Sequence, residues 1–189
     1  ATHYLAAYPQ SDRSDLAKVA VKNHYYGTLN PKAHMQKIIT EEQALAGFVV
    51  AHPLRLLDCS LISDGAASII MVREGLADRF EKPVWLTGLG CASETHAIAR
   101  RRSLTSLEST CIAAEQAYRM ARIEAKDVDV AVVHDCFTIA ELIAYEDLGF
   151  CGRGEAAMLI RDQETYVGGR IPVNPDGGLK AKGHPIGAT

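Results

Sequence analysis

The chain contains 189 residues, of which 48% are hydrophobic and 23% are charged, the composition of an ordinary globular protein. Its net charge of -3 argues against the basic surface with which proteins bind nucleic acids or anionic membranes, and no apolar run approaches the roughly 18 residues that span a bilayer. Its five cysteines form no CxxC pair, so neither a disulfide framework nor a zinc ribbon is expected. Free thiols in a reducing, cytoplasm-like compartment fit this pattern.

Two helices are expected in the first fifty residues. The segment 11–26 places Asp12 and Asp15 at the end of a helix where negative charge is favourable. A shorter helix is expected over 40–45. No strong strand pattern occurs before about residue 52, so this part of the chain suits a loop-rich or helical subdomain.

The remainder of the chain alternates between strand and helix patterns. Strands are expected over 69–72, 83–89, 128–133 and 154–160, and helices over 104–120 and 139–148, the last of these capped by Thr138. The run 128–133 is almost continuously apolar, which is typical of a strand covered on both faces. The alternation indicates an α/β layered fold.

Two short motifs carry residues suited to chemistry. His134 and Cys136 directly follow the apolar strand, where sites of α/β sheets collect, and residues two apart in extended chain share a side. A thiol beside an imidazole offers a nucleophile or a proton carrier, although the motif standing alone is more often a pair of buried structural side chains. His184 lies between glycine and proline on a stiff loop, as either a general base or an ordinary loop histidine.

Together, the two motifs resemble the thiolase family. His134-Asp135-Cys136-Phe137 is followed by Gly-Gly-Leu-x-x-x-Gly-His-Pro-Ile-Gly-Ala-Thr, and the histidines of the two motifs are fifty residues apart. The first motif is similar to that of the sterol-carrier-protein-x type thiolases and of archaeal and bacterial acetyl-CoA acetyltransferases, whereas most thiolases carry Asn-Glu-Ala-Phe there. Weaker matches are Asp58 to Ala67 and Lys22-Asn23-His24.

The resemblance implies a layered αβαβα fold of two similar halves, which is incomplete in this chain. Residues 1–53 would be the tail of the loop subdomain that covers coenzyme A. Residues 54–81 would be the last strand region of the first half, and residues 82–189 would form most of the second half. The chain lacks an initial Met and a secretory signal and stops within the glycine-rich motif, so we expect an internal piece of a larger protein.

The resemblance also implies roles in reversible Claisen chemistry on 3-oxoacyl-CoA. His184 would deprotonate a nucleophilic cysteine, His134 would help hold a water that stabilises the thioester enolate oxygen, and Cys136 would move a proton at the α-carbon. Coenzyme A would be a substrate, with no covalently bound cofactor and no metal. Family resemblance further implies a homodimer or homotetramer, with room for a small partner subunit, in the cytoplasm or, in a eukaryote, the peroxisome.

Several alternatives stand beside this interpretation. Cys91-Ala92-Ser93 spells the family's Cys-x-Ser nucleophile pattern, but that nucleophile lies upstream of the loop subdomain, so Cys91 is expected to be structural and this chain inactive by itself. A zinc site would need distant ligands without local pairing, namely His134, Cys136, Cys151 and His184. A ketoacyl-synthase-like condensing enzyme and a non-catalytic acyl-CoA-binding subunit are the alternative functions.

Overall fold

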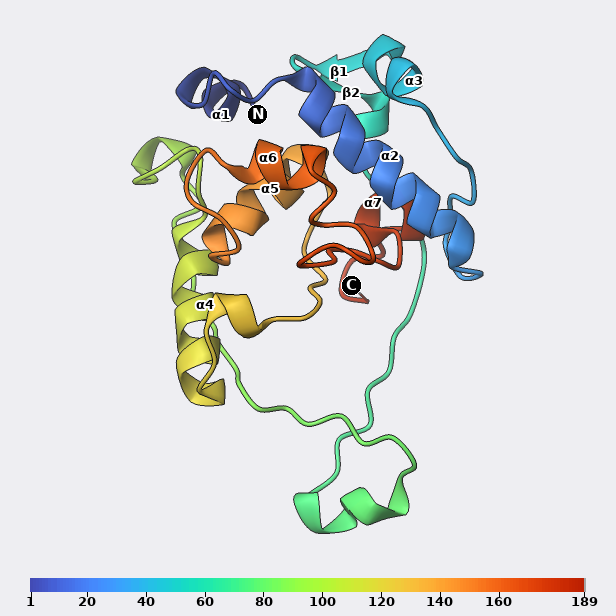
Figure 1. Cartoon of the computed structure of the whole chain (residues 1–189), viewed down its shortest axis with the longest axis vertical. Helices are drawn as coiled ribbons and strands as arrows, with labels where there is room; N and C mark the ends of the chain where they lie inside the picture. Colours follow the sequence, from blue (N-terminus) through green and yellow to red (C-terminus); the bar gives the residue numbers. More distant parts are fainter. Residues whose placement is uncertain (189) are drawn as a thin grey trace.

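The computed structural model describes residues 1–188, and the long helix α2 (Arg13–Leu29) crosses its body in Figure 1. The helix begins after Asp12, whose carboxylate accepts the N–H of Ser14 at 2.6 Å, while the carboxylate of Asp15 accepts the N–H of Asp12 at 2.8 Å. This reciprocal capping box satisfies N–H groups that the first turn leaves unpaired. The helix predicted over 11–26 is therefore confirmed, and it extends to Leu29.

Six further α-helices and one small sheet make up most of the regular structure of residues 1–188. The helices are α1 (Thr2–Ala7), α3 (Glu41–Ala46), α4 (Glu108–Ala121), α5 (Thr138–Asp147), α6 (Ala156–Arg161) and α7 (Gly178–Lys182). Strand β1 (Val49–Ala51) pairs antiparallel with β2 (Leu54–Arg55), and the short 3-10 helices are η1 (Leu56–Asp58), η2 (Glu74–Arg79), η3 (Ile98–Arg100) and η4 (Ala125–Asp127). The helices expected over 40–45 and 139–148 are confirmed, and the one expected over 104–120 begins only at Glu108.

The predicted cap of α5 was wrong. Thr138 is the first residue of the helix, and Phe137 occupies the cap position without a side-chain hydrogen bond. The Thr138 hydroxyl donates instead to the carboxylate of Asp58 at 2.9 Å. Asp58 is buried, so this long-range acceptor takes the hydroxyl that a local cap would have used.

An apolar core joins α1, α2, α5 and α6 to the segment that leads into α7. Its buried members include Tyr4, Leu16, Val19, Ile139, Leu142, Tyr145, Ile160, Ile171 and Val173. α5 contributes Leu142 and Tyr145 to this core, both without exposed surface. The core thus anchors α5 directly behind the predicted motif at 134–137. No helix within residues 1–188 combines the length and the apolar character that a bilayer span requires.

The strands predicted in the second part of the chain are not formed as strands. The prediction over 154–160 was wrong because α6 occupies this segment, and its buried residues Ala156, Ala157, Leu159 and Ile160 follow helical spacing. The segment 128–133 is extended but makes only one isolated parallel bridge, between Ala131 and Val173. A strand needs a neighbour along its whole length, which this segment lacks among the described residues.

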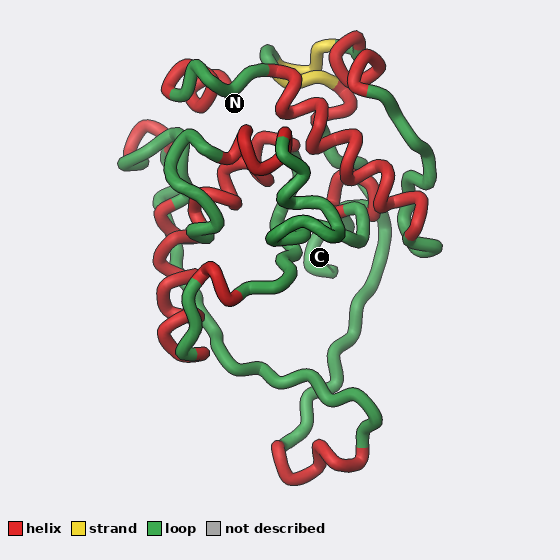
Figure 2. The backbone as a smooth tube through the Cα atoms, viewed as in Figure 1, coloured by secondary structure: helices red, strands yellow, loops and turns green. Residues whose placement is uncertain are grey.

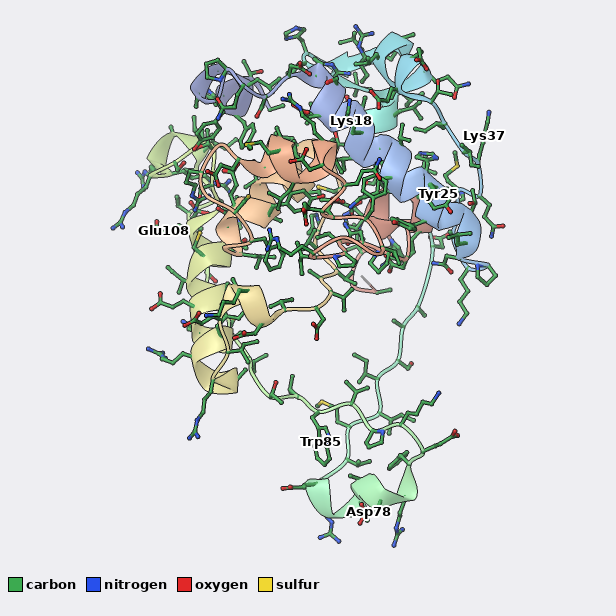
Figure 3. All side chains as sticks on the ribbon, in the orientation of Figure 1. Lys18, Tyr25, Lys37, Asp78, Trp85 and Glu108 are labelled. Atoms are coloured by element: carbon green, nitrogen blue, oxygen red, sulfur yellow. The ribbon has the colours of Figure 1, made fainter. Side chains whose placement is uncertain are left out.

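The strands predicted over 69–72 and 83–89 fall mainly in an extended arm, which we define as residues 64–87. Figures 1 and 2 show this arm leaving the body as a loop, and Figure 3 labels Asp78 and Trp85 at its far end. It exposes large apolar side chains, including Ile70 at 85% and Val84 at 96%. The arm returns to the body along α4.

Candidate functional site

Three chain segments converge at the site that the sequence predicted. Cys59 forms an antiparallel bridge with Phe137, and the N–H of Ser60 donates to the carbonyl of Cys136 at 2.8 Å. Two residues later, Ile62 forms a parallel bridge with His184. The segment 59–62 therefore lies between the two motifs and connects them through backbone pairing.

The structure brings His134 and His184 together. Their ring centroids lie 5.0 Å apart with an interplanar angle of 81°, an edge-to-face arrangement. The turn before His184 requires glycine, because Gly183 has φ +117° and a Cβ there would lie 2.8 Å from the Ser63 hydroxyl oxygen. Partial desolvation lowers the pKa of the His134 imidazole, and the neighbouring His184 lowers it further. His134 is therefore neutral at pH 7, with one ring nitrogen free to accept and one to donate.

Cys136 is half-buried in the same segment as His134. Burial raises the pKa of its thiol, and the neighbouring Asp135 raises it further. The thiol is thus protonated at neutral pH, which suits a proton donor better than a ready nucleophile.

An open cavity lies beside the second motif. It has a volume of about 480 Å³, and Gly183, Pro185, Ser63, His34 and Lys32 are among the residues that line it. The Nδ1 atom of His34 is 2.8 Å from the Ser63 hydroxyl, so this side of the cavity is hydrogen-bonded in place. The cavity offers a ligand room beside Gly183 and Pro185, the two chain neighbours of His184.

A buried polar network under the site was missed from the sequence. At its centre, Glu141 of α5 forms an ion pair with Lys22 of α2 and accepts the Tyr145 hydroxyl. Its second oxygen accepts from the amides of Asn23 and Asn174, each at 2.7 Å. The signal in the sequence was a glutamate placed between Leu142 and Ile139 on the apolar face of α5.

A second part of this network links the end of α2 to α7. The Nε2 atom of His24 lies 3.1 Å from the ammonium of Lys180, and its Nδ1 atom lies 2.9 Å from the carbonyl of Lys37. Burial lowers the pKa of both His24 and Lys180, and the Lys180 charge lowers that of His24 further. A neutral His24 that donates through Nδ1 and accepts the Lys180 ammonium through Nε2 fits these distances.

Other cysteines named in the sequence lie elsewhere. Cys91 is exposed, and its N–H donates to the Gln116 side chain of α4 at 3.0 Å. Cys151 is half-buried between α5 and α6, where burial and then Glu146 raise its pKa to about 12. Among residues 1–188, no group of three or more His, Cys, Asp or Glu side chains is arranged to hold a metal ion. Thr189, the last residue of the second motif, lies outside the described residues.

Two proteins with sequences similar to this chain are informative here. An acetyl-CoA acetyltransferase of Methanothermobacter thermautotrophicus is 46% identical over 178 residues, which cover 94% of this chain and 46% of that protein. Sterol carrier protein 2 of Gallus gallus is 36% identical over 179 residues, which cover 92% of this chain and 33% of that protein. The chain therefore spans less than half the length of these two relatives.

A solved structure and a family model agree with these relatives. The structure described as "Ltp2-ChsH2(DUF35) aldolase" superposes with a TM-score of 0.85 at 28% identity, covering 97% of this chain and 49% of that one. A second solved structure, of an SCP2-thiolase like protein from Mycobacterium smegmatis, superposes with a TM-score of 0.71 at 17% identity, covering 97% of this chain and 40% of that one. The fold is therefore α/β and thiolase-like, and the layered fold class predicted from the sequence is confirmed. The family described as "Thiolase C-terminal domain-like" matches residues 90–189, more than half of the chain. With two histidines at the predicted site and this match across its second half, the chain belongs to the thiolase C-terminal domain-like family.

Proposed function

We propose that this chain is part of a thiolase, an acyl-CoA C-acyltransferase that interconverts 3-oxoacyl-CoA plus CoA with acetyl-CoA plus a shortened acyl-CoA. The observation that carries the proposal is the pair of imidazoles, His134 and His184, with ring centroids 5.0 Å apart. The similarity to an acetyl-CoA acetyltransferase supports the same chemistry. Coenzyme A is a substrate in this proposal, and no resident cofactor takes part.

Each residue of the site has a distinct task in this chemistry. His184 acts as the general base that takes the proton from a nucleophilic cysteine. His134, kept neutral by its lowered pKa, donates a hydrogen bond toward the developing enolate oxygen through a water. Cys136, protonated at neutral pH, exchanges a proton with the substrate α-carbon.

The surroundings of the site fit an acyl-CoA substrate. Lys32, Asp64 and Lys182 line the cavity of about 480 Å³ that Gly183 and Pro185 border, and Lys182 is paired with Asp176 at 2.7 Å. Lys32 would attract the anionic part of coenzyme A. In this assignment residues 1–53 belong to the loop subdomain, residues 54–81 to the first half and residues 82–189 to the second half, and the nucleophile lies outside this chain. The similar aldolase carries a second named component, which supports a small partner subunit here in addition to self-association.

The His184→Ala variant tests the proposed base. In the protein at full length, we expect CoA-dependent cleavage of acetoacetyl-CoA to slow by about 10²–10⁴-fold, the usual contribution of a general base. His3→Ala removes an exposed histidine of α1 and serves as the matched control, with an unchanged rate. A His184 variant that retains most of its cleavage rate would sink the assignment.

The Cys136→Ala variant tests the proposed proton carrier. Acyl transfer to the nucleophile should proceed nearly normally, because that step needs His184 and not Cys136. Condensation of two acetyl-CoA molecules, which requires proton removal at an α-carbon, should slow by about 10²-fold or more. Cys91→Ala, at an exposed position, is the control. Equal slowing of both steps, or of neither, would remove Cys136 from this role.

A further inference from the structure

Asp135 lies between His134 and Cys136 in sequence, but its carboxylate is fully buried. One oxygen, Oδ1, accepts the N–H of Leu179 at 2.6 Å. The other, Oδ2, accepts the side-chain amide of Asn23 at 2.8 Å and the N–H of Lys180 at 3.2 Å. The carboxylate therefore binds two separate segments of the chain, helix α2 and the first turn of α7.

Helix α7 depends on an acceptor supplied from outside the helix. Its cap residue, Gly177, has no side chain, so the N–H groups of its first turn need partners elsewhere. Asp176 accepts the N–H of Gly178 at 3.0 Å, and Asp135 accepts the next two. The helix ends at Lys182, two residues before His184. The groups that hold the start of α7 therefore also hold His184, the proposed general base.

We propose that Asp135 is a positioning residue that sets the separation of the two site histidines by capping α7 with its buried carboxylate. His134 is the covalent neighbour of Asp135, and His184 follows the helix that Asp135 caps. The positions of both imidazoles therefore depend on the Asp135 carboxylate. The consequence for catalysis rests on the proposed function, whereas the structural connection does not.

The local backbone is shaped to admit this carboxylate. Gly178 has φ +58°, and a Cβ at this position would lie 2.3 Å from Asp135 Oδ2. A Cβ on Gly177 would lie 2.8 Å from the Cα of Gly27 in α2. Any side chain at Gly178 would therefore displace the carboxylate from the helix start.

Charged groups from three elements face Asp135. Glu141 of α5 repels its carboxylate, while Lys22 of α2 and Lys180 of α7 attract it. Burial is the largest influence, and with Glu141 it raises the pKa of Asp135 to about 7 against the opposing N–H donors. The carboxylate is fully formed only above neutral pH, so the cap is best tested at pH 8.

The Asp135→Asn variant, made in the protein at full length, tests the cap directly. An amide cannot accept at both ends, so hydrogen exchange of segment 178–184 should accelerate by about tenfold to a hundredfold. The kcat for acetoacetyl-CoA cleavage should fall by about tenfold or more with KM changed less than about threefold, because His184 is displaced while the part of the cavity wall formed by Lys32, His34 and Ser63 stays in place. Asp15→Asn is the matched control: it removes another fully buried carboxylate, paired with Arg161, and should leave exchange at 178–184 unchanged.

A second variant covers the case in which Asp135→Asn fails to fold. Gly178→Ala keeps the carboxylate and displaces it, and should reproduce the faster exchange and the fall in kcat. Gly168→Ala, at φ +95° with no atom within 4 Å of its Cβ position, imposes similar backbone strain without the clash and should do neither.

The readouts separate the two proposals. Unchanged exchange in both Asp135→Asn and Gly178→Ala overturns the cap, and faster exchange with unchanged kcat overturns its role in positioning His184. If the wild-type protein cleaves no acetoacetyl-CoA, the proposed function fails, while exchange still decides whether Asp135 caps α7.

Discussion

The interior beneath the site and the arm distribute their side chains in opposite ways. In the interior, Lys22, Asp135 and Glu141 have no exposed surface, although all three carry ionisable groups. In the arm, residues 64–87, apolar side chains such as Ile70 and Val84 are at least 85% exposed. Charge is thus buried beneath the site, whereas apolar surface is exposed in the arm.

The difference shows what each region depends on. Every buried charge beneath the site has a partner from another element, so its burial is compensated within residues 1–188. The arm has few neighbours, and its apolar side chains gain nothing from burial. Substitutions should therefore have large effects in the network, intermediate effects where the arm meets α4, and small effects within the arm.

The largest effect is expected for Glu141→Ala. The change leaves Lys22 buried without its ionic partner, and it removes one of the two acceptors of the Asn23 amide and the acceptor of the Asn174 amide. Breaking a buried pair in this way typically costs about 3–5 kcal/mol of unfolding free energy. Urea denaturation of this chain at pH 7 measures the loss. Glu124→Ala removes an exposed carboxylate paired with Lys126 and should leave the urea midpoint nearly unchanged. Equal losses of unfolding free energy in Glu141→Ala and Glu124→Ala would contradict the difference expected between the buried network and an exposed carboxylate.

An intermediate effect is expected where the arm joins the body. A Cβ on Gly90 would lie 1.8 Å from the carbonyl oxygen of Ala113 in α4. Gly90→Ala should therefore push the chain off this helix, at a cost of about 1–3 kcal/mol in unfolding free energy. Gly75→Ala, with no atom within 4 Å of its Cβ position, should change stability by less than about 0.5 kcal/mol. Thermal or urea unfolding compares them, and equal stability would show that 88–91 does not pack on α4.

The smallest effect is expected for Ile70→Ser in the arm. The side chain is 85% exposed, so its replacement should change the unfolding free energy of this chain by less than about 0.5 kcal/mol. Leu142→Ala, at a fully buried position of α5, is the opposite case and should cost about 2–5 kcal/mol. A large loss in the Ile70 variant would mean that the arm packs against a neighbour under the conditions of the measurement.

Much of the helical structure could be predicted because its signals are local. The capping box of Asp12 and Asp15 marked the start of α2, and Thr40 with Gln43 forms the same device at α3. Strand predictions failed for the opposite reason. The apolar runs over 69–72 and 128–133 read as strands, but a strand depends on hydrogen bonds to a distant segment. Among the described residues such partners are limited to isolated bridges, for example Ala131 with Val173.

The sequence by itself determined the helices α2, α3, α4 and α5, the family resemblance and the two motifs that contain His134, Cys136 and His184. Only the tertiary structure decided that the two imidazoles lie 5.0 Å apart and that Asp135, unassigned from the sequence, caps the helix before His184. The physical reason is the range of the interactions. Caps and helical periodicity act over three or four residues, whereas the bond from Asp135 to Leu179 crosses 44 positions of the chain and exists only after folding.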